Sequence, residues 1–317
     1  MRATAWKSRK RSRSTNCRSC WRQACHSPIR ATNGSDDYFK VARITYPEWT
    51  AQSTPFQWIW SMKVLLEDLK ARRQDDPMQP NEPRNPEETV LSLDRTFTFA
   101  CHDSLPCFTQ CCRDVNIFLT PYDILRLRRA LGISAGEILV KYTRSLIADP
   151  APVPFFQLLM DPGTLRCKLV TEDGCSVYEH RPWACRMYPL DPTGRPGEFR
   201  AIVGKERCLG LRESPTWTVG LWLENQGIDA SYEAMDQAFQ SIMSMDLKPA
   251  AHLGEEIGKL IYLAYDMDRF AGMIQEDRFR STFEVDDETL REALQNDEAL
   301  LRLALDFIRN RLEDLLL

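Results

Sequence analysis

The chain has 317 residues, 43% of them hydrophobic, which is enough to bury a core, so we expect one domain of about 200–250 residues plus an extension. Its net charge of −4 argues against a nucleic-acid-binding protein, because such proteins carry a basic face. No run of about 18 uncharged apolar residues occurs, so we expect no membrane span, and no apolar signal segment opens the chain. We therefore expect a cytoplasmic protein, and in that reducing compartment clustered thiols are usually metal ligands or redox groups.

Residues 1–61 differ in composition from the rest of the chain. They carry eleven Lys and Arg against three Asp and Glu, a local charge of +8 that leaves −12 for the other 256 residues. The spacing of Cys17, Cys20 and Cys25, followed by His26, is similar to that of a metal-binding motif. One interpretation of this region is therefore a small zinc knuckle or a basic nucleic-acid-binding arm. We favour a disordered or non-native extension instead, because Met62 opens a more natural beginning.

Residues 62–96 are predicted to be a helix and a linker. A short amphipathic helix is expected from Met62 to Arg72. Residues 74–86 contain four prolines, which remove backbone donors and disfavour helix before them. Partial alternation from Val90 to Ala100 predicts a strand that leads into the cysteines of a domain over residues 97–215.

Eight of the eleven cysteines lie within that domain and form the predicted metal site. Adjacent Cys111 and Cys112 cannot point the same way in an extended strand, and a disulfide between them would be strained. Three residues separate Cys107 from Cys111, so both sulfurs can reach one centre. Thiolate suits Zn²⁺ or an iron–sulfur cluster and disfavours Mg²⁺ and Ca²⁺. The predicted ligands are Cys101, Cys107, Cys111, Cys112, Cys167, Cys175, Cys185 and Cys208.

The number of thiols leaves the kind of site open. A tetrahedral zinc site takes four thiolates, so eight can form two such sites or one cluster with spare cysteines. The plain alternative is that the cysteines are small buried hydrophobic residues without a metal. His102 and His180 lie near the cysteines in sequence, but we expect both to stay outside the ligand set. Arg181 and Arg186 can either donate to an anionic cluster or its substrate, or hold loop carbonyls.

Helix-capping signals follow the first group of cysteines. Thr120 as the N-cap, Pro121 at the first helical position and Asp123 in a capping box predict a helix that stops at Gly132. The same box signal at residues 134–137 predicts a second helix, which runs to about residue 142.

The second group of cysteines has its own local signals. Residues 167–178 predict a β-hairpin with Asp173 and Gly174 as its turn, which brings Cys167 and Cys175 toward one end of the structure. Cys185 follows on a turn or a short helix.

Residues 216–317 contain no cysteine and are predicted to be mainly helical, with packing and partner contact as their role. The acidic pairs at residues 255–256 and 286–287 fall at expected helix starts, where the helix dipole favours negative charge, so we assign them no catalytic role. The predicted fold class is α+β, with a small cysteine-rich metal-binding core of short strands and a β-hairpin before the helical C-terminal region. The expected helical segments are Thr216–Leu223, Tyr232–Met245, Leu253–Phe270, Asp287–Gln295 and, after Asn296 as a cap, Asp297–Leu317.

Several motifs around the cysteines occur together over about residues 97–190, roughly a third of the chain. They are Cys111-Cys-Arg113, Leu119-Thr-Pro-Tyr-Asp-Ile-Leu-Arg-Leu127, Leu131-Gly-Ile-Ser134, Gly174-Cys-Ser-Val-Tyr178, Arg181-Pro182 and Cys185-Arg-Met-Tyr-Pro189. This combination resembles a cysteine-cluster family of zinc- or iron-chelating domains. That family often places two residues between successive cysteines. Here five residues separate Cys101 from Cys107 and three separate Cys107 from Cys111, so it stays open which thiols share a centre.

The resemblance implies metal binding. The best-defined relatives in the family are flagellin lysine N-methylases, which look like iron–sulfur proteins that modify lysines. The chain has no Gly-x-Gly fingerprint for a nucleotide, and Asp114 interrupts a radical-type Cys-x3-Cys-x2-Cys triplet.

Three functions are therefore considered. The first is an iron–sulfur protein, expected to be of the 4Fe–4S kind, that serves electron transfer or protein modification. The second is a zinc-stabilised, non-catalytic interaction module, and the third is an enzyme similar to a protein lysine N-methyltransferase. We expect a protein partner but neither a membrane nor a nucleic acid, and these residues do not distinguish an enzyme from a binding protein.

Overall fold

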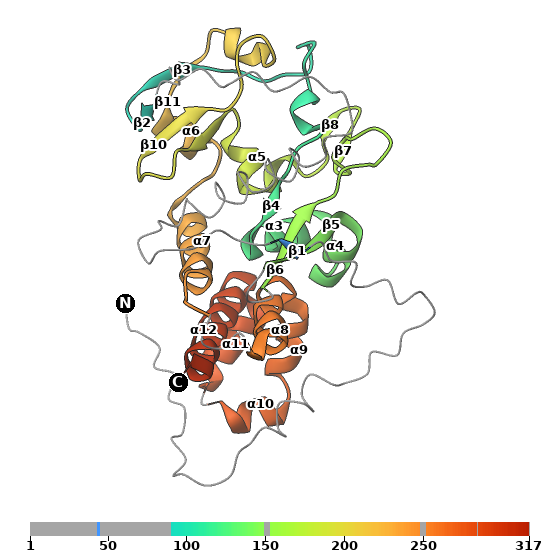
Figure 1. The fold of residues 1–317 in the computed structure, drawn as a ribbon, viewed down its shortest axis with the longest axis vertical. Coiled ribbons are helices and arrows are strands. Elements are labelled where there is room, and N and C mark those ends of the chain that lie inside the picture. The colour runs from blue at the N-terminus through green and yellow to red at the C-terminus, as the bar shows by residue number, and fades with distance from the viewer. Residues whose placement is uncertain (1–42, 45–89, 149–152, 248–251, 284, 317) are drawn as a thin grey trace.

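The computed structural model describes residues 43–44, 90–148, 153–247, 252–283 and 285–316 (Figure 1). The helix expected from Met62 to Arg72, the linker after it and nearly all of the extension over residues 1–61 lie outside the described residues. Short strands and the cysteine-bearing segments occupy the upper half of the view, and most of the C-terminal helices occupy the lower half. This arrangement confirms the α+β class with a helical C-terminal region.

The largest sheet among the described residues has the strand order β1-β5-β6-β4. Its strands are β1 (Arg43–Ile44), β4 (Phe118–Leu119), β5 (Thr143–Ala148) and β6 (Val153–Leu158). β1 runs parallel to β5, and the other pairs are antiparallel. β6 is buried along its whole length and packs on the C-terminal helices, where the rings of Phe156 and Tyr265 lie 4.6 Å apart between centroids.

Two further sheets form the upper end of the molecule. One has the order β2-β10-β9, from β2 (Leu91–Ser92), β10 (Glu198–Ala201) and β9 (Leu190–Pro192). The other pairs β3 (Thr96–Thr98) with β11 (Thr216–Thr218).

These two sheets correct two expectations from the sequence. The single strand expected over Val90–Ala100 is two short strands, because the N–H of Arg95 donates to the carbonyl of Ser92 at 3.0 Å and closes a turn. The helix expected to begin at Thr216 begins later, because residues 216–218 pair with β3. The helix that follows is α6 (Val219–Asn225).

The capping signals predicted the next helices correctly. α3 (Pro121–Leu131) begins with the complete Thr120–Asp123 capping box and ends at Gly132, whose φ of 63° is left-handed. α4 (Ala135–Tyr142) begins with the second capping box. α3 lies at the centre of the fold, where it contacts α4, β4 and three helices of the C-terminal region. These helices are α7 (Ala230–Met243), α8 (Gly254–Tyr265) and α12 (Asp297–Leu316).

After β11, the described part of the C-terminal region is helical. Three predicted segments have the expected helices, α7, α11 (Asp287–Gln295) and α12. The segment expected as one helix over Leu253–Phe270 is two helices, because Asp266 ends the first and caps the second. Asn296 accepts hydrogen bonds from the N–H groups of Glu298 and Ala299, as expected of a cap. The two helices of the Leu253–Phe270 segment are α8 and α9 (Met267–Ile274), and α10 (Asp277–Thr282) follows them.

The predicted β-hairpin is present but short. β7 (Val170–Thr171) pairs with β8 (Gly174–Cys175), and the register places Thr171 opposite Gly174. The two-residue turn is therefore Glu172–Asp173, one residue earlier than expected. Gly174 has a φ of 111°, which suits glycine better than other residues.

One hydrophobic core joins both halves of the molecule. At the upper end, Trp222 of α6 packs against Phe97 and Phe99, with ring centroids 6.0 Å and 5.0 Å away. Phe99 is buried and stands two residues before Cys101. Aromatic packing therefore fixes the position from which the first cysteine segment starts.

Candidate metal centre

The eight predicted ligands come from four separate parts of the upper half. Cys101, Cys107, Cys111 and Cys112 lie on the segment after β3, which ends in the 3-10 helix η1 (Gln110–Cys112). The hairpin is the second part, with Cys167 just before it and Cys175 in β8. The third part is the short helix α5 (Trp183–Met187), which contains Cys185. Cys208 precedes the 3-10 helix η3 (Leu209–Arg212). All eight cysteines are free thiols.

The start of the first segment is held against the chain around Cys208. The N–H of Ala100 donates to the carbonyl of Gly210 at 3.0 Å. A Cβ at Gly210 would lie 2.4 Å from the carbonyl oxygen of Ala100, so only glycine allows this approach. The sulfur of Cys107 also accepts the N–H of Leu209 at 3.4 Å. Segments about 100 residues apart in sequence are thus joined beside the thiols of Cys107 and Cys208.

Four thiols gather at this junction, and we call them the outer group. Burial raises the pKa of the Cys101 thiol to about 11, and the neighbouring thiols of the group add to the effect. The hydroxyl of Tyr188 is hydrogen-bonded to Cys208, and burial followed by this bond raises the tyrosine pKa. Cys101 and Cys111 are exposed, whereas Cys208 is buried. The outer group consists of Cys101, Cys107, Cys111 and Cys208.

The other four thiols, which we call the inner group, gather where η1, the hairpin and α5 meet. The N–H of Cys167 donates to the carbonyl of Cys112 at 2.8 Å, which joins the second cysteine segment to η1. Cys175 pairs in register with Val170, whose N–H in turn donates to the carbonyl of Cys167 at 3.1 Å. Burial raises the pKa of Cys185, with the Cys167 thiol as the next cause. The inner group consists of Cys112, Cys167, Cys175 and Cys185.

Cys111 and Cys112 are the point where the two groups meet. Their sulfur atoms lie 3.9 Å apart, within reach of a weak hydrogen bond between thiols. This bond lowers the pKa of Cys111 to about 7 and, together with burial, raises that of Cys112. Cys111 therefore becomes a thiolate near neutral pH, and thiolate is the form that binds metal.

The arginines beside the cysteines hold loop carbonyls, which was one of the two roles expected for them. Arg181 is buried, donates to the carbonyl of Tyr178 at 2.6 Å and lies 3.8 Å from the centre of its ring. Arg186 donates to the carbonyls of Arg181, Gln226 and Glu179. The Arg181 guanidinium also partly opposes the burial that raises the pKa of Cys101, Cys175 and Cys185. It thus supplies positive charge to thiols of both groups.

A buried carboxylate fixes the helix that carries Cys185. Asp123, fully buried at the start of α3, accepts the N–H of Trp183 at 2.9 Å and the hydroxyl of Tyr232. The same carboxylate accepts the N–H of Thr120 at 3.0 Å. One side chain therefore closes the first turn of α3 and the first turn of α5. The sequence predicted only the first of these roles.

A second buried acid lies close to Asp123. Burial raises the pKa of Asp236 well above its usual value, and the nearby Asp123 carboxylate adds to this shift. One carboxyl oxygen of Asp236 is buried without a hydrogen-bond partner. Burial also raises the pKa of Asp123.

The two histidines make different contacts. His102 is exposed, accepts or donates a hydrogen bond with Ser104 at 2.7 Å and lies 3.6 Å from Glu213. His180 follows the carbonyl that Arg126 and Arg186 hold, and burial lowers its pKa. Neither histidine lies in the outer or the inner group.

The thiols are gathered without converging on a single point. Among the described residues, no three His, Cys, Asp or Glu side chains converge closely enough to hold a metal. The donor set nevertheless suits a soft metal, because the outer and inner groups contain only sulfur donors and each has four of them. Binding would require the thiols of a group to move together.

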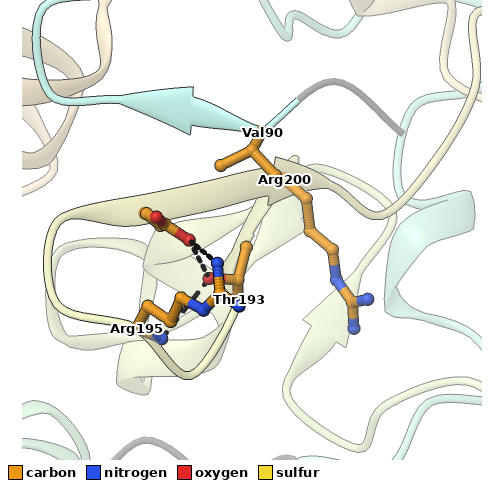
Figure 2. A pocket seen from close by; sticks show the side chains of 5 residues that line it. Val90, Thr193, Arg195 and Arg200 are labelled. Carbon is orange, nitrogen blue, oxygen red and sulfur yellow. Dashed lines mark hydrogen bonds and ion pairs between the residues drawn. The ribbon is translucent and has the colours of Figure 1, made fainter. Parts of the chain in front are cut away.

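A separate pocket of about 280 Å³ lies at the β9–β10 hairpin, and Figure 2 shows it from close by. Thr193 donates to Glu198 at 3.3 Å, and Arg195 lies 3.8 Å from the same carboxylate. The lining residues are Val90, Thr193, Arg195, Glu198 and Arg200, and they include no cysteine. This pocket is therefore not part of the cysteine site.

Comparison with known protein families bears directly on this sulfur-only donor set. Residues 100–209 match the CxxCxxCC family model, described as "Putative zinc- or iron-chelating domain". This chelating domain is about a third of the chain and contains both the outer and the inner group. The match supports metal binding and leaves the choice between zinc and iron open. Comparisons with curated proteins and with solved structures found no significant match.

None of the helices in the described ranges is both long enough and apolar enough to cross a membrane.

Proposed function

We propose that the chelating domain holds a cysteine-ligated iron–sulfur cluster that serves electron transfer or protein modification. The observation that carries this proposal is the gathering of eight free thiols from four parts of the chain, without a histidine or carboxylate among them. Iron–sulfur clusters are held by cysteine thiolates. Burial disfavours ionised thiols, and Arg181, placed beside both groups, supplies compensating positive charge.

The exposure of the thiols bears on how such a cluster would work. Cys101 and Cys111 are exposed, so one edge of the site faces solvent, while Cys167 and Cys208 are buried. An exposed edge allows a protein partner to approach the cluster, which electron transfer or modification of a protein requires. The proposal therefore includes a protein partner that contacts the region around Cys101 and Cys111.

A zinc-stabilised module is the second candidate, and the backbone favours it. Between β3 and β4, regular structure is limited to the three-residue η1. A metal that joins this segment to Cys167 and Cys208 would supply folding energy that local hydrogen bonds do not. Nothing in the described residues favours lysine methylation, so it is not part of the proposal.

One experiment separates these candidates. The full chain is purified without oxygen, and its visible absorption, iron, zinc and acid-labile sulfide are measured on one sample. We expect visible charge-transfer absorption with equal amounts of iron and sulfide. Colourless protein that contains zinc would support the second candidate, and protein without either metal would overturn both.

A further inference from the structure

We infer that the eight thiols form two separate metal centres, one held by the outer group and one by the inner group. The inference rests on the proposed function and deepens it, since it assigns ligands and a stoichiometry to the same site. It applies whether each centre holds zinc or an iron–sulfur cluster.

The ligand number is the first argument. A tetrahedral zinc ion takes four thiolates, and a four-iron cluster is likewise held by four cysteines. Eight gathered thiols therefore exceed what a single centre of either kind uses. A single centre would leave four free thiols beside it, two or more of them partly buried.

Backbone contacts assign four thiols to the outer centre. The hydrogen bond from Ala100 to Gly210 brings Cys101 beside the Cys208 segment, and the bond from Leu209 to the Cys107 sulfur brings Cys107 there as well. Cys111 completes the set, since it follows Cys107 in one tight loop in which the N–H of Gln110 donates to the carbonyl of Cys107 at 3.0 Å. The outer centre is thus built where the chain from Ala100 to Cys107 contacts η3.

A different set of contacts assigns the inner centre. The hydrogen bond from Cys167 to the carbonyl of Cys112 joins these two residues directly. Register pairing with Val170 holds Cys175 over the turn that starts at Cys167. Asp123 fixes α5, and with it Cys185, through the N–H of Trp183. The inner centre is thus built around the junction of η1 with the hairpin and α5.

Cys111 and Cys112 make the partition testable. Their sulfurs lie 3.9 Å apart, a separation that two ligands of one tetrahedral zinc would also have at about 2.3 Å per Zn–S bond. The two-centre inference instead places these adjacent residues on different metals. Substituting one or the other should therefore remove different centres.

The experiment uses the full chain in which Cys17, Cys20 and Cys25 are changed to alanine, so that only the eight cysteines of residues 101–208 remain. Iron, zinc and sulfide are counted per chain after anaerobic purification. We expect two zinc ions or eight irons. Four irons would overturn the two-centre inference while the proposed function stands. One zinc would overturn the two-centre inference and favour the second candidate over the iron–sulfur cluster, and the absence of metal would overturn the proposed function itself.

Variants of this background then test the ligand assignment. We expect Cys111→Ala and Cys208→Ala each to halve the metal content, and the double variant to lose no more than either alone. Cys112→Ala and Cys185→Ala should behave in the same way as a second pair. Combining Cys111→Ala with Cys112→Ala should remove all metal. Equal, partial losses that add within a pair would overturn the partition.

A measurement without ligand variants keeps the inference testable if they do not fold. The background protein is treated with a chelator, and N-ethylmaleimide labelling of each cysteine is followed over time by peptide mass spectrometry. We expect the four thiols of one group to become labelled together and those of the other group together at a different rate. Labelling that mixes members of the two groups would contradict the partition.

Discussion

Replacing Asp123 with alanine tests whether one carboxylate holds the helix that carries Cys185. The substitution leaves the N–H groups of Thr120 and Trp183 and the hydroxyl of Tyr232 without their acceptor. Each buried donor that loses its partner costs about 1–3 kcal/mol. Burial of the carboxylate, which raises the pKa of Asp123, offsets part of that cost when the group is removed. We therefore expect Asp123→Ala to lower the free energy of unfolding by about 2–4 kcal/mol.

The assay is urea unfolding of the metal-free protein, followed by circular dichroism. Tyr232→Phe is the matched control, because it removes one of the three donors and leaves the carboxylate in place; we expect it to cost about 1 kcal/mol. Asp123→Asn should lie between them, since an amide has one acceptor oxygen for three donors. In the metal-loaded protein, a chelator should remove metal faster from Asp123→Ala than from Tyr232→Phe. A shift below about 1 kcal/mol for Asp123→Ala would refute the anchoring role.

Three further outcomes are expected. In the metal-free protein, alkylation of Cys111 should be half-maximal near pH 7, since its hydrogen bond with Cys112 lowers its pKa to about 7. Cys112→Ala should move that midpoint to higher pH. An unchanged midpoint would contradict this effect of the hydrogen bond. The raised pKa of Asp236 means that the folded chain keeps a proton that the unfolded chain releases above about pH 4, so stability should fall as pH rises, by at most about 1.4 kcal/mol per pH unit. Urea unfolding should show a smaller loss of stability between pH 5 and pH 8 for Asp236→Asn than for the unchanged chain. The same loss in both proteins would contradict the role of Asp236. Gly132→Ala should lower the free energy of unfolding by about 1 kcal/mol. The cause is backbone strain at a φ of 63°, because a Cβ at this position meets no atom within 4 Å. An unchanged melting temperature would contradict this prediction.

The elements that the sequence predicted well are those with local signals. The capping boxes at Thr120 and Ser134 and the glycine at position 132 depend on residues within one turn, and α3 and α4 begin and end as they indicate. The strand β11 was missed because its partner, β3, lies about 120 residues earlier, and pairing over such a distance leaves no local pattern.

The candidate site divides in the same way. The sequence pointed to the eight cysteines, because closely spaced thiols are a local pattern. It did not indicate which thiols lie together, since the contacts of Leu209 with Cys107 and of Cys167 with Cys112 join distant segments. Asp123 was recognised as a capping residue from its neighbours, but its bond to Trp183, 60 residues later, was not predictable from spacing.

The long separation between Cys111 and Cys208 also bears on the order of events during synthesis. Every residue assigned to the inner centre has been made once Cys185 has left the ribosome, whereas the outer centre lacks Cys208 at that moment. The inner centre can therefore be loaded on a nascent chain while Cys101, Cys107 and Cys111 still wait for their fourth partner. Those three thiols would meanwhile be open to oxidation. The outer centre would therefore depend more strongly than the inner one on when metal is delivered.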